Sequence, residues 1–144
     1  MERILISACL VGDKVKYNGG DNLSPKIDAL LEKYELVPFC PEVEGGLPIP
    51  RSPSERKDGR VINQEGEDVT DAFYKGAELA YNICLYLKIK TAILKERSPS
   101  CGSKTIYDGT FKHKEISGMG VTAEYLKEKG IVVLSEEEID SLLQ

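Results

Sequence analysis

Residues 91–103 read TAILKERSPSCGS, a short apolar run followed at once by a polar turn that contains Cys101. The same order occurs twice more, because residues 3–9 read RILISAC and residues 35–40 read ELVPFC. A short apolar run bounded by polar or turn residues is typical of a strand buried on both faces of a sheet. The sequence therefore predicts three buried strands, each followed by a cysteine.

Helical patterns separate these strands. A serine and a proline at residues 24–25 look like the start of a helix that runs to about residue 33. A longer apolar stripe predicts a helix from Asp68 to about residue 88. A further helix is expected to end near Lys129, and a capping box formed by residues 135–138 predicts a last helix that runs to Leu143.

A fourth apolar run, at residues 131–134, completes a regular alternation of strands and helices. This alternation predicts an α/β fold, a Rossmann-like doubly wound parallel sheet of about four strands flanked by helices. Right-handed crossovers make the simplest strand order second, first, third and fourth. Residues 60–63 and 105–111 are expected to form hairpin strands outside this sheet. The chain of 144 residues fits one domain, residues 1–144.

The composition narrows the function classes. A formal net charge of −5 disfavours a duplex nucleic-acid partner, which usually binds a basic face. Basic residues gather near 51–57 and 95–104, which suits a small anionic ligand. No apolar run is long enough to cross a membrane, and the apolar start is too short for a signal peptide. We expect a cytoplasmic protein with reduced thiols, and the oligomeric state stays open.

In such sheets, ligands bind beyond the carboxyl ends of the strands, where the strand order reverses. Cys9, Cys40 and Cys101 should therefore meet at one edge of the sheet. Three thiolates indicate a metal centre: zinc usually takes a fourth protein ligand, whereas an iron–sulfur cluster on three cysteines keeps one iron open. The only histidine, His113, lies among lysines and is expected at the surface. A disulfide or three unrelated buried thiols is the alternative, and Cys84 belongs to the helical stripe and hence to the core.

Polar residues beside these cysteines are candidates for catalysis and binding. Glu42 and Ser100 could move protons next to a bound substrate, although a carboxylate paired with an arginine and a turn hydroxyl explain them equally well. Arg51 and Arg97 could hold a phosphate or carboxylate with a forked contact, or be solvated. The turn at Gly12 could present backbone amides to an anion.

Seven short motifs, in order, resemble those of the thiouracil desulfurase (TudS) family, and the resemblance runs from about residue 4 to residue 134. They are SACLVG at 7–12, YNG at 17–19, CPEV at 40–43, GGL at 45–47, PR at 50–51, DVT at 68–70 and LKERSPSCG at 94–102. The resemblance implies an oxygen-sensitive [4Fe-4S] cluster held by three cysteines, which fall on Cys9, Cys40 and Cys101. It also implies removal of sulfur from a thiolated uracil or its nucleotide, giving uracil or UMP and sulfide.

The resemblance points to Glu42 and Ser100 as the proton-handling pair. We expect the small-molecule substrate to contact Arg51, Gly12 and Ser98, with Arg51 near a 5′-phosphate if the substrate is a nucleotide. Two other classes stay open. One is a thiol-based reductase or zinc-dependent hydrolase that uses the same cysteines. The other is a non-catalytic carrier of sulfur or metal.

Overall fold

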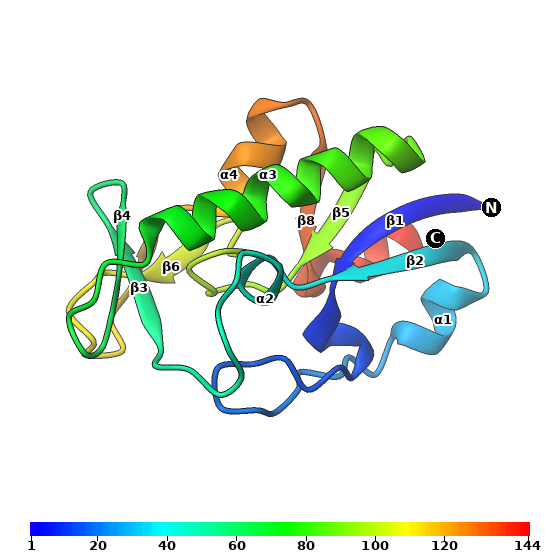
Figure 1. The fold of residues 1–144 in the computed structure, drawn as a ribbon. Helices are drawn as coiled ribbons and strands as arrows, with labels where there is room; N and C mark the ends of the chain where they lie inside the picture. The colour runs from blue at the N-terminus through cyan, green and yellow to red at the C-terminus, as the bar shows by residue number, and fades with distance from the viewer.

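The computed structural model describes residues 1–144 and is built around a four-stranded parallel sheet (Figure 1). The strands are β1 (Glu2–Ser7), β2 (Tyr34–Phe39), β5 (Thr91–Leu94) and β8 (Val132–Ser135). Their order across the sheet is β2-β1-β5-β8, and every neighbouring pair is parallel. The predicted doubly wound fold and strand order are confirmed.

Helices cover both faces of the sheet (Figure 1). On one face lie α3 (Thr70–Leu87) and α4 (Val121–Glu128). On the other lie α1 (Ile27–Leu31) and two 3-10 helices, η1 (Ala8–Val11) and η2 (Glu136–Leu142). None of the helices combines the length and the apolar character needed to cross a membrane.

The alternating side chains of β1 explain the two layers. Leu5 belongs to a buried cluster with Ala80 of α3, whereas Ile4 and Ile6 belong to a second cluster with Ile139 of η2. Successive side chains of a strand point to opposite faces, so a continuous apolar run supplies both cores at once. Residues 4–6 are apolar throughout because neither face of this part of the strand meets water.

Two antiparallel hairpins lie beyond the carboxyl ends of the parallel strands (Figure 1). β3 (Ser54–Lys57) pairs with β4 (Arg60–Asn63), and β6 (Thr105–Tyr107) pairs with β7 (Glu115–Ser117). Both residues of the 58–59 turn have positive φ, at 53° and 77°, as a tight two-residue hairpin requires. The predicted strand at 60–63 is confirmed.

The prediction for residues 105–111 names the wrong pairing partner for the strand that begins at Thr105. We expected this segment to fold back on itself, but its strand pairs with β7, and residues 108–114 form the connecting loop. A distant side chain holds the loop open, since the amides of Gly109 and Phe111 donate to Glu55 Oε1 at 2.9 and 3.1 Å. This contact comes from β3 and carries no local sequence signal.

Two helices differ from their predicted form. The helix expected at residues 24–33 is only the five residues of α1, because the Ser24 hydroxyl accepts the Lys26 amide in a turn that precedes it. The last segment is the 3-10 helix η2 rather than an α-helix. Its predicted capping box is present: the Ser135 side chain accepts a backbone amide of the first turn, and the Glu138 side chain accepts the backbone amide of Ser135. The start of the last helix is correct because its cap is a local signal, whereas α1 begins two residues later than predicted.

Candidate functional site

The three cysteines that follow the central strands lie at one edge of the sheet. Cys9 is in η1, directly after β1, Cys40 follows β2 directly, and Cys101 lies on the loop after β5. All three line a single cavity of about 560 Å³, and none forms a disulfide. A cavity of this size is within the range of about 300–1,000 Å³ that is usual for small-molecule sites.

A short helix, α2 (Pro41–Glu44), places Glu42 beside the second cysteine. This helix packs against α3 with backbone against backbone. A β-carbon built on Gly76 would overlap the carbonyl oxygen of Pro41 and lie 2.7 Å from its carbonyl carbon, and one built on Gly45 would overlap a carbonyl oxygen of α3. These two glycines therefore determine how closely the Glu42 segment approaches the core.

The turn that carries the third cysteine is held by backbone hydrogen bonds on both sides. Ser98 Oγ accepts the amides of Ser100 and Cys101, each at 3.1 Å. The first amides of α4, those of Val121 and Thr122, donate to carbonyl oxygens in the same turn at 2.9 and 2.8 Å. Helix N-termini leave such amides without partners inside the helix, so α4 and the turn satisfy each other.

A chain of side-chain hydrogen bonds connects four residues that line the cavity. Ser98 Oγ lies 2.9 Å from Ser100 Oγ, and Ser100 Oγ donates to Glu42 Oε2 at 2.8 Å. The other oxygen of Glu42 accepts Arg51 Nε at 3.1 Å. Because both acceptor sites of Ser98 Oγ already face backbone amides, its hydrogen must point to Ser100. The hydrogens of the chain therefore run toward the Glu42 carboxylate.

The guanidinium group of Arg51 is hydrogen-bonded to groups of the protein itself. Its side chain is only 7% exposed, and its Nη atoms donate to the carbonyl oxygens of Pro48 at 3.2 Å and Val15 at 2.9 Å. The pairing of Glu42 with an arginine is thus present together with the contact to Ser100. A buried ion pair is poorly screened by solvent, so Arg51 holds the Glu42 carboxylate in place.

Two other candidate residues take no part in this chain of hydrogen bonds. Gly12 is absent from the lining of the cavity, and its amide donates to the Cys9 carbonyl at 3.2 Å. Arg97 lines the cavity, but it is half-exposed and pairs with Glu115 and Glu137 at 2.9 and 3.1 Å. The structure brings together the three cysteines, Glu42, Arg51, Ser98 and Ser100, and it leaves Gly12 outside.

Sequence reasoning missed the outer wall of the cavity, which both hairpins and the loop after η1 supply. Its residues include Lys16, Tyr17, Gln64, Tyr107, Phe111 and His113. Arg97, Phe111 and His113 all have positive φ, at 69°, 59° and 57°. Non-glycine residues with positive φ are uncommon and concentrate at functional sites. The aromatic residues around the 108–109 turn were the one available signal in the sequence.

Burial favours the protonated form of the thiols in the site. Burial raises the pKa of Cys9, Cys40 and Cys101, and it raises that of Cys101 to about 12. A metal binds the thiolate and releases the proton, so its positive charge would offset the cost of a buried anion. Cys84 lies on the buried face of α3, outside the cavity, at 1% exposure.

The donor set fits an iron–sulfur cluster. No group of three or more His, Cys, Asp or Glu side chains is arranged to hold a single metal ion. The cysteine ligands of a cluster bind different irons, so they need to share a cavity rather than one coordination sphere. Three soft sulfur donors around one cavity meet that need, and they would leave one iron of a [4Fe-4S] cluster without a protein ligand.

Comparison with known proteins agrees with this geometry. The chain matches the family model described as 2-thiouracil desulfurase over residues 4–138. It is 41% identical over 150 residues to the uncharacterized protein YbbK of Bacillus subtilis (strain 168), covering 97% of this chain and 99% of YbbK. Among solved structures it is similar to the [4Fe-4S]-dependent thiouracil desulfidase TudS, with a TM-score of 0.93, 46% sequence identity and coverage of 99% of this chain and 95% of that chain.

These matches extend over nearly the full chain, so they include the sheet, both hairpins and all three cysteines at its carboxyl edge. They also agree with the family resemblance that the motifs predict. The chain belongs to the 2-thiouracil desulfurase family.

Proposed function

We propose that this protein removes sulfur from a thiolated uracil or its nucleotide by hydrolysis, with a [4Fe-4S] cluster bound to Cys9, Cys40 and Cys101. One observation carries the proposal: three free thiols and a hydrogen-bonded serine–glutamate pair line the same cavity. The similar solved structure is described as [4Fe-4S]-dependent, which supports the cofactor. The proposed setting is the cytoplasm, where thiols stay reduced.

The reaction replaces the exocyclic sulfur of the ring by oxygen. A carbon–oxygen bond to water forms, the carbon–sulfur bond breaks, and the products are uracil or UMP and hydrogen sulfide, with no net transfer of electrons. When bound, the cluster supplies an iron without a cysteine ligand, a Lewis acid for the substrate sulfur. The protein must supply the base and a path for the proton.

Glu42 is the proposed base. One of its oxygens is held by Arg51 at 3.1 Å and the other accepts Ser100 at 2.8 Å, so the carboxylate is fixed at the edge of the cavity. A positioned carboxylate that takes a proton from attacking water contributes a rate factor of about 10²–10⁴. We assign Arg51 to the orientation of this base, because three of its donors already face protein groups.

Ser100 is the proposed proton carrier. Its hydroxyl lies between Glu42 and the third cysteine, with Oγ 3.6 Å from Cys101 Sγ. It can accept the proton received by Glu42 and give its own hydrogen to the ring nitrogen or the leaving sulfur, while Ser98 keeps donating its hydrogen bond to Ser100. Contact of Ser98 or Gly12 with substrate, and of Arg51 with a 5′-phosphate, stays a prediction.

Metal content and sulfide release test the proposal. Protein that is purified and reconstituted without oxygen should hold about four iron and four sulfide per chain. It should release sulfide from at least one of 4-thiouracil, 4-thiouridine and 4-thio-UMP, and the rank of the three identifies the substrate class. C101A should lose both cluster and activity.

Cys84→Ala is the matched control for that variant. It removes a buried thiol of the same chain from a position outside the cavity, so it should keep the cluster and the activity at some cost in stability. Full activity in C101A, or activity with zinc or without metal, would contradict the proposal and favour a thiol-based or zinc-dependent enzyme. Sulfur transfer without turnover would favour a carrier.

A further inference from the structure

Glu96 is a buried carboxylate that the proposed reaction does not use. Its residue is 2% exposed, and no lysine, arginine or histidine pairs with it. A buried charge without an opposite charge is costly unless hydrogen bonds replace the lost water. The hydrogen-bond donors around this carboxylate therefore indicate its role in the structure.

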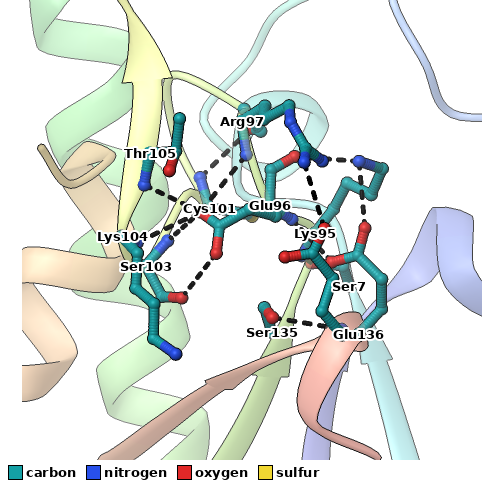
Figure 2. A network of polar contacts seen from close by, with 12 residues as sticks. Ser7, Lys95, Glu96, Arg97, Cys101, Ser103, Lys104, Thr105, Ser135 and Glu136 are labelled. Atoms are coloured by element: carbon teal, nitrogen blue, oxygen red, sulfur yellow. Dashed lines mark hydrogen bonds and ion pairs between the residues drawn. The ribbon is translucent and has the colours of Figure 1, made fainter. Parts of the chain in front are cut away.

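Backbone amides of a single loop surround it. Oε1 accepts the amides of Ser103 at 2.9 Å, Lys104 at 3.1 Å and Thr105 at 3.1 Å, with a longer contact from Arg97 at 3.4 Å. Oε2 accepts the Ser103 hydroxyl at 3.0 Å. Figure 2 shows these donors converging on Glu96 from both ends of the loop.

The carboxylate is held in its charged form. Burial acts to raise the pKa of Glu96. The hydrogen bonds from the Lys104 and Thr105 amides and from the Ser103 hydroxyl lower it by more than burial raises it, so the pKa lies below its usual value. An ionised carboxylate makes stronger hydrogen bonds than a neutral amide would, so the loop is closed firmly.

Glu96 is itself anchored to the sheet. Its amide donates to Glu136 Oε1 at 2.7 Å, and the preceding residue, Lys95, donates its amide to Ser7 Oγ at 2.9 Å and pairs its ammonium with Glu136 Oε2 at 3.0 Å. Ser7 is the last residue of β1, and Glu136 begins η2. The backbone at Glu96 is thus tied to two elements of the core, while its side chain closes the loop that follows.

We propose that Glu96 is the positioning residue for the third cluster ligand. It fixes the loop of residues 97–105 against the sheet and so directs the Cys101 thiol and the Ser100 hydroxyl into the cavity. It acts through backbone amides and needs no contact with substrate. This inference rests on the proposed function for its consequence in catalysis, but the geometry of the loop can be measured without it.

Three variants separate the contributions of this side chain. Glu96→Gln keeps the shape and one carbonyl oxygen for the loop amides, and its new NH₂ can donate to the Ser103 hydroxyl. Glu96→Asp keeps the charge but moves the carboxylate one methylene away from the loop amides. Glu96→Ala removes both the charge and the oxygen acceptors. Thr70→Val is the control, because it deletes a buried acceptor of the Val61 amide far along the chain from the loop.

The first readout uses protein without metal. Iodoacetamide should alkylate Cys101 about tenfold faster or more in Glu96→Ala and Glu96→Asp, because an opened loop exposes a thiol that is now 3% exposed. Peptide mass spectrometry should show an unchanged rate at Cys84, and Glu96→Gln should stay near the parent protein. Thr70→Val should lower the Tm without changing the rate at Cys101.

The second readout uses the reconstituted protein. The electron paramagnetic resonance spectrum of the reduced cluster should change in Glu96→Ala and Glu96→Asp, and kcat per cluster should fall about tenfold or more while KM stays similar. Glu96→Gln should restore both. The alkylation result stands even if no thiouracil is turned over, which keeps this inference separate from the proposed function.

Parent-like behaviour would overturn the proposal. This means alkylation of Cys101 at the parent rate, an unchanged spectrum and kcat within about twofold in a folded Glu96→Asp or Glu96→Ala. If Glu96→Ala does not fold, Glu96→Asp and Glu96→Gln decide the question alone. A drop in Tm that matches Thr70→Val, with no change at Cys101, would make Glu96 a stability residue only.

Discussion

Ser98 and Ser100 show how backbone geometry sets the direction of the hydrogen bonds in the proposed proton path. Ser98 Oγ receives two amides of its own turn, so its single hydrogen is available only to Ser100, and that of Ser100 then goes to Glu42. Nothing in the chemistry of two serines prescribes this direction. It follows from a turn in which the amides, rather than the carbonyl oxygens, face the hydroxyl.

Ser100→Ala should break this path while the cluster remains. The change leaves Glu42 Oε2 without its donor and removes the proposed carrier, so kcat should fall by about 10²–10³. Sulfide release, normalised to bound iron, measures the effect. Ser141→Ala, on an exposed hydroxyl of η2, is the control and should be neutral. Activity of Ser100→Ala within about twofold of the parent would remove Ser100 from the mechanism.

At the scale of elements, the contact between α2 and α3 sets the depth of the Glu42 segment. Gly45 and Gly76 stand where a β-carbon would overlap backbone atoms of the opposite helix. Two backbones in such close contact transmit displacement directly, because neither side has a flexible side chain that could yield. The second cysteine, which precedes α2, therefore depends on a glycine in the middle of α3.

Gly76→Ala should destabilise the protein although it favours the helix. Alanine at a helix interior gains about 1 kcal/mol over glycine, but overpacking against the Pro41 backbone costs about 1–3 kcal/mol and displaces Cys40. Urea denaturation should show a net loss of stability, and iron binding should fall with it. Glu78→Ala, on the exposed face of the same helix, should change neither. A Gly76→Ala protein with raised stability and full iron would show that α2 moves freely.

At the scale of the molecule, the cofactor would connect segments that are far apart in the chain. Its three proposed ligands follow three different strands, so a cluster held by them could bind only when the sheet has formed. A ligand that binds only the native state stabilises it by mass action. Both helical layers and the central sheet should therefore share in the gain when the cluster binds.

Cluster binding should raise the Tm measurably. A gain of about 2.7 kcal/mol, expected for a ligand at 100 times its Kd, corresponds to roughly 5–10 °C in a domain of this size. Calorimetry under nitrogen should show this rise over the metal-free protein, and exposure to oxygen with a chelator should reverse it. C101A should show no rise. Equal Tm values with and without cluster would mean that the ligands are not tied into the fold as described.

The sequence by itself determined the sheet and the place of the cysteines. Apolar runs, helical stripes and caps are short-range patterns, so strands, helices and their order could be predicted, and with them the meeting of Cys9, Cys40 and Cys101 at the carboxyl edge. The family followed from motifs that surround the same cysteines. The hairpin at β6 and the length of α1 were wrong, since distant contacts and local turns decided them.

Only the tertiary structure decided which partners the polar residues of the site contact. Glu42 meets Ser100 across 58 positions in the chain, and Glu96 meets the Glu136 side chain across 40. The direction of a hydrogen bond, the burial of a carboxylate and the contacts of Arg51 with Glu42 and Val15 all depend on partners that packing brings together. A pattern of residue types carries no record of such pairs, because hydrogen-bond geometry is set by positions in space and not by spacing along the chain.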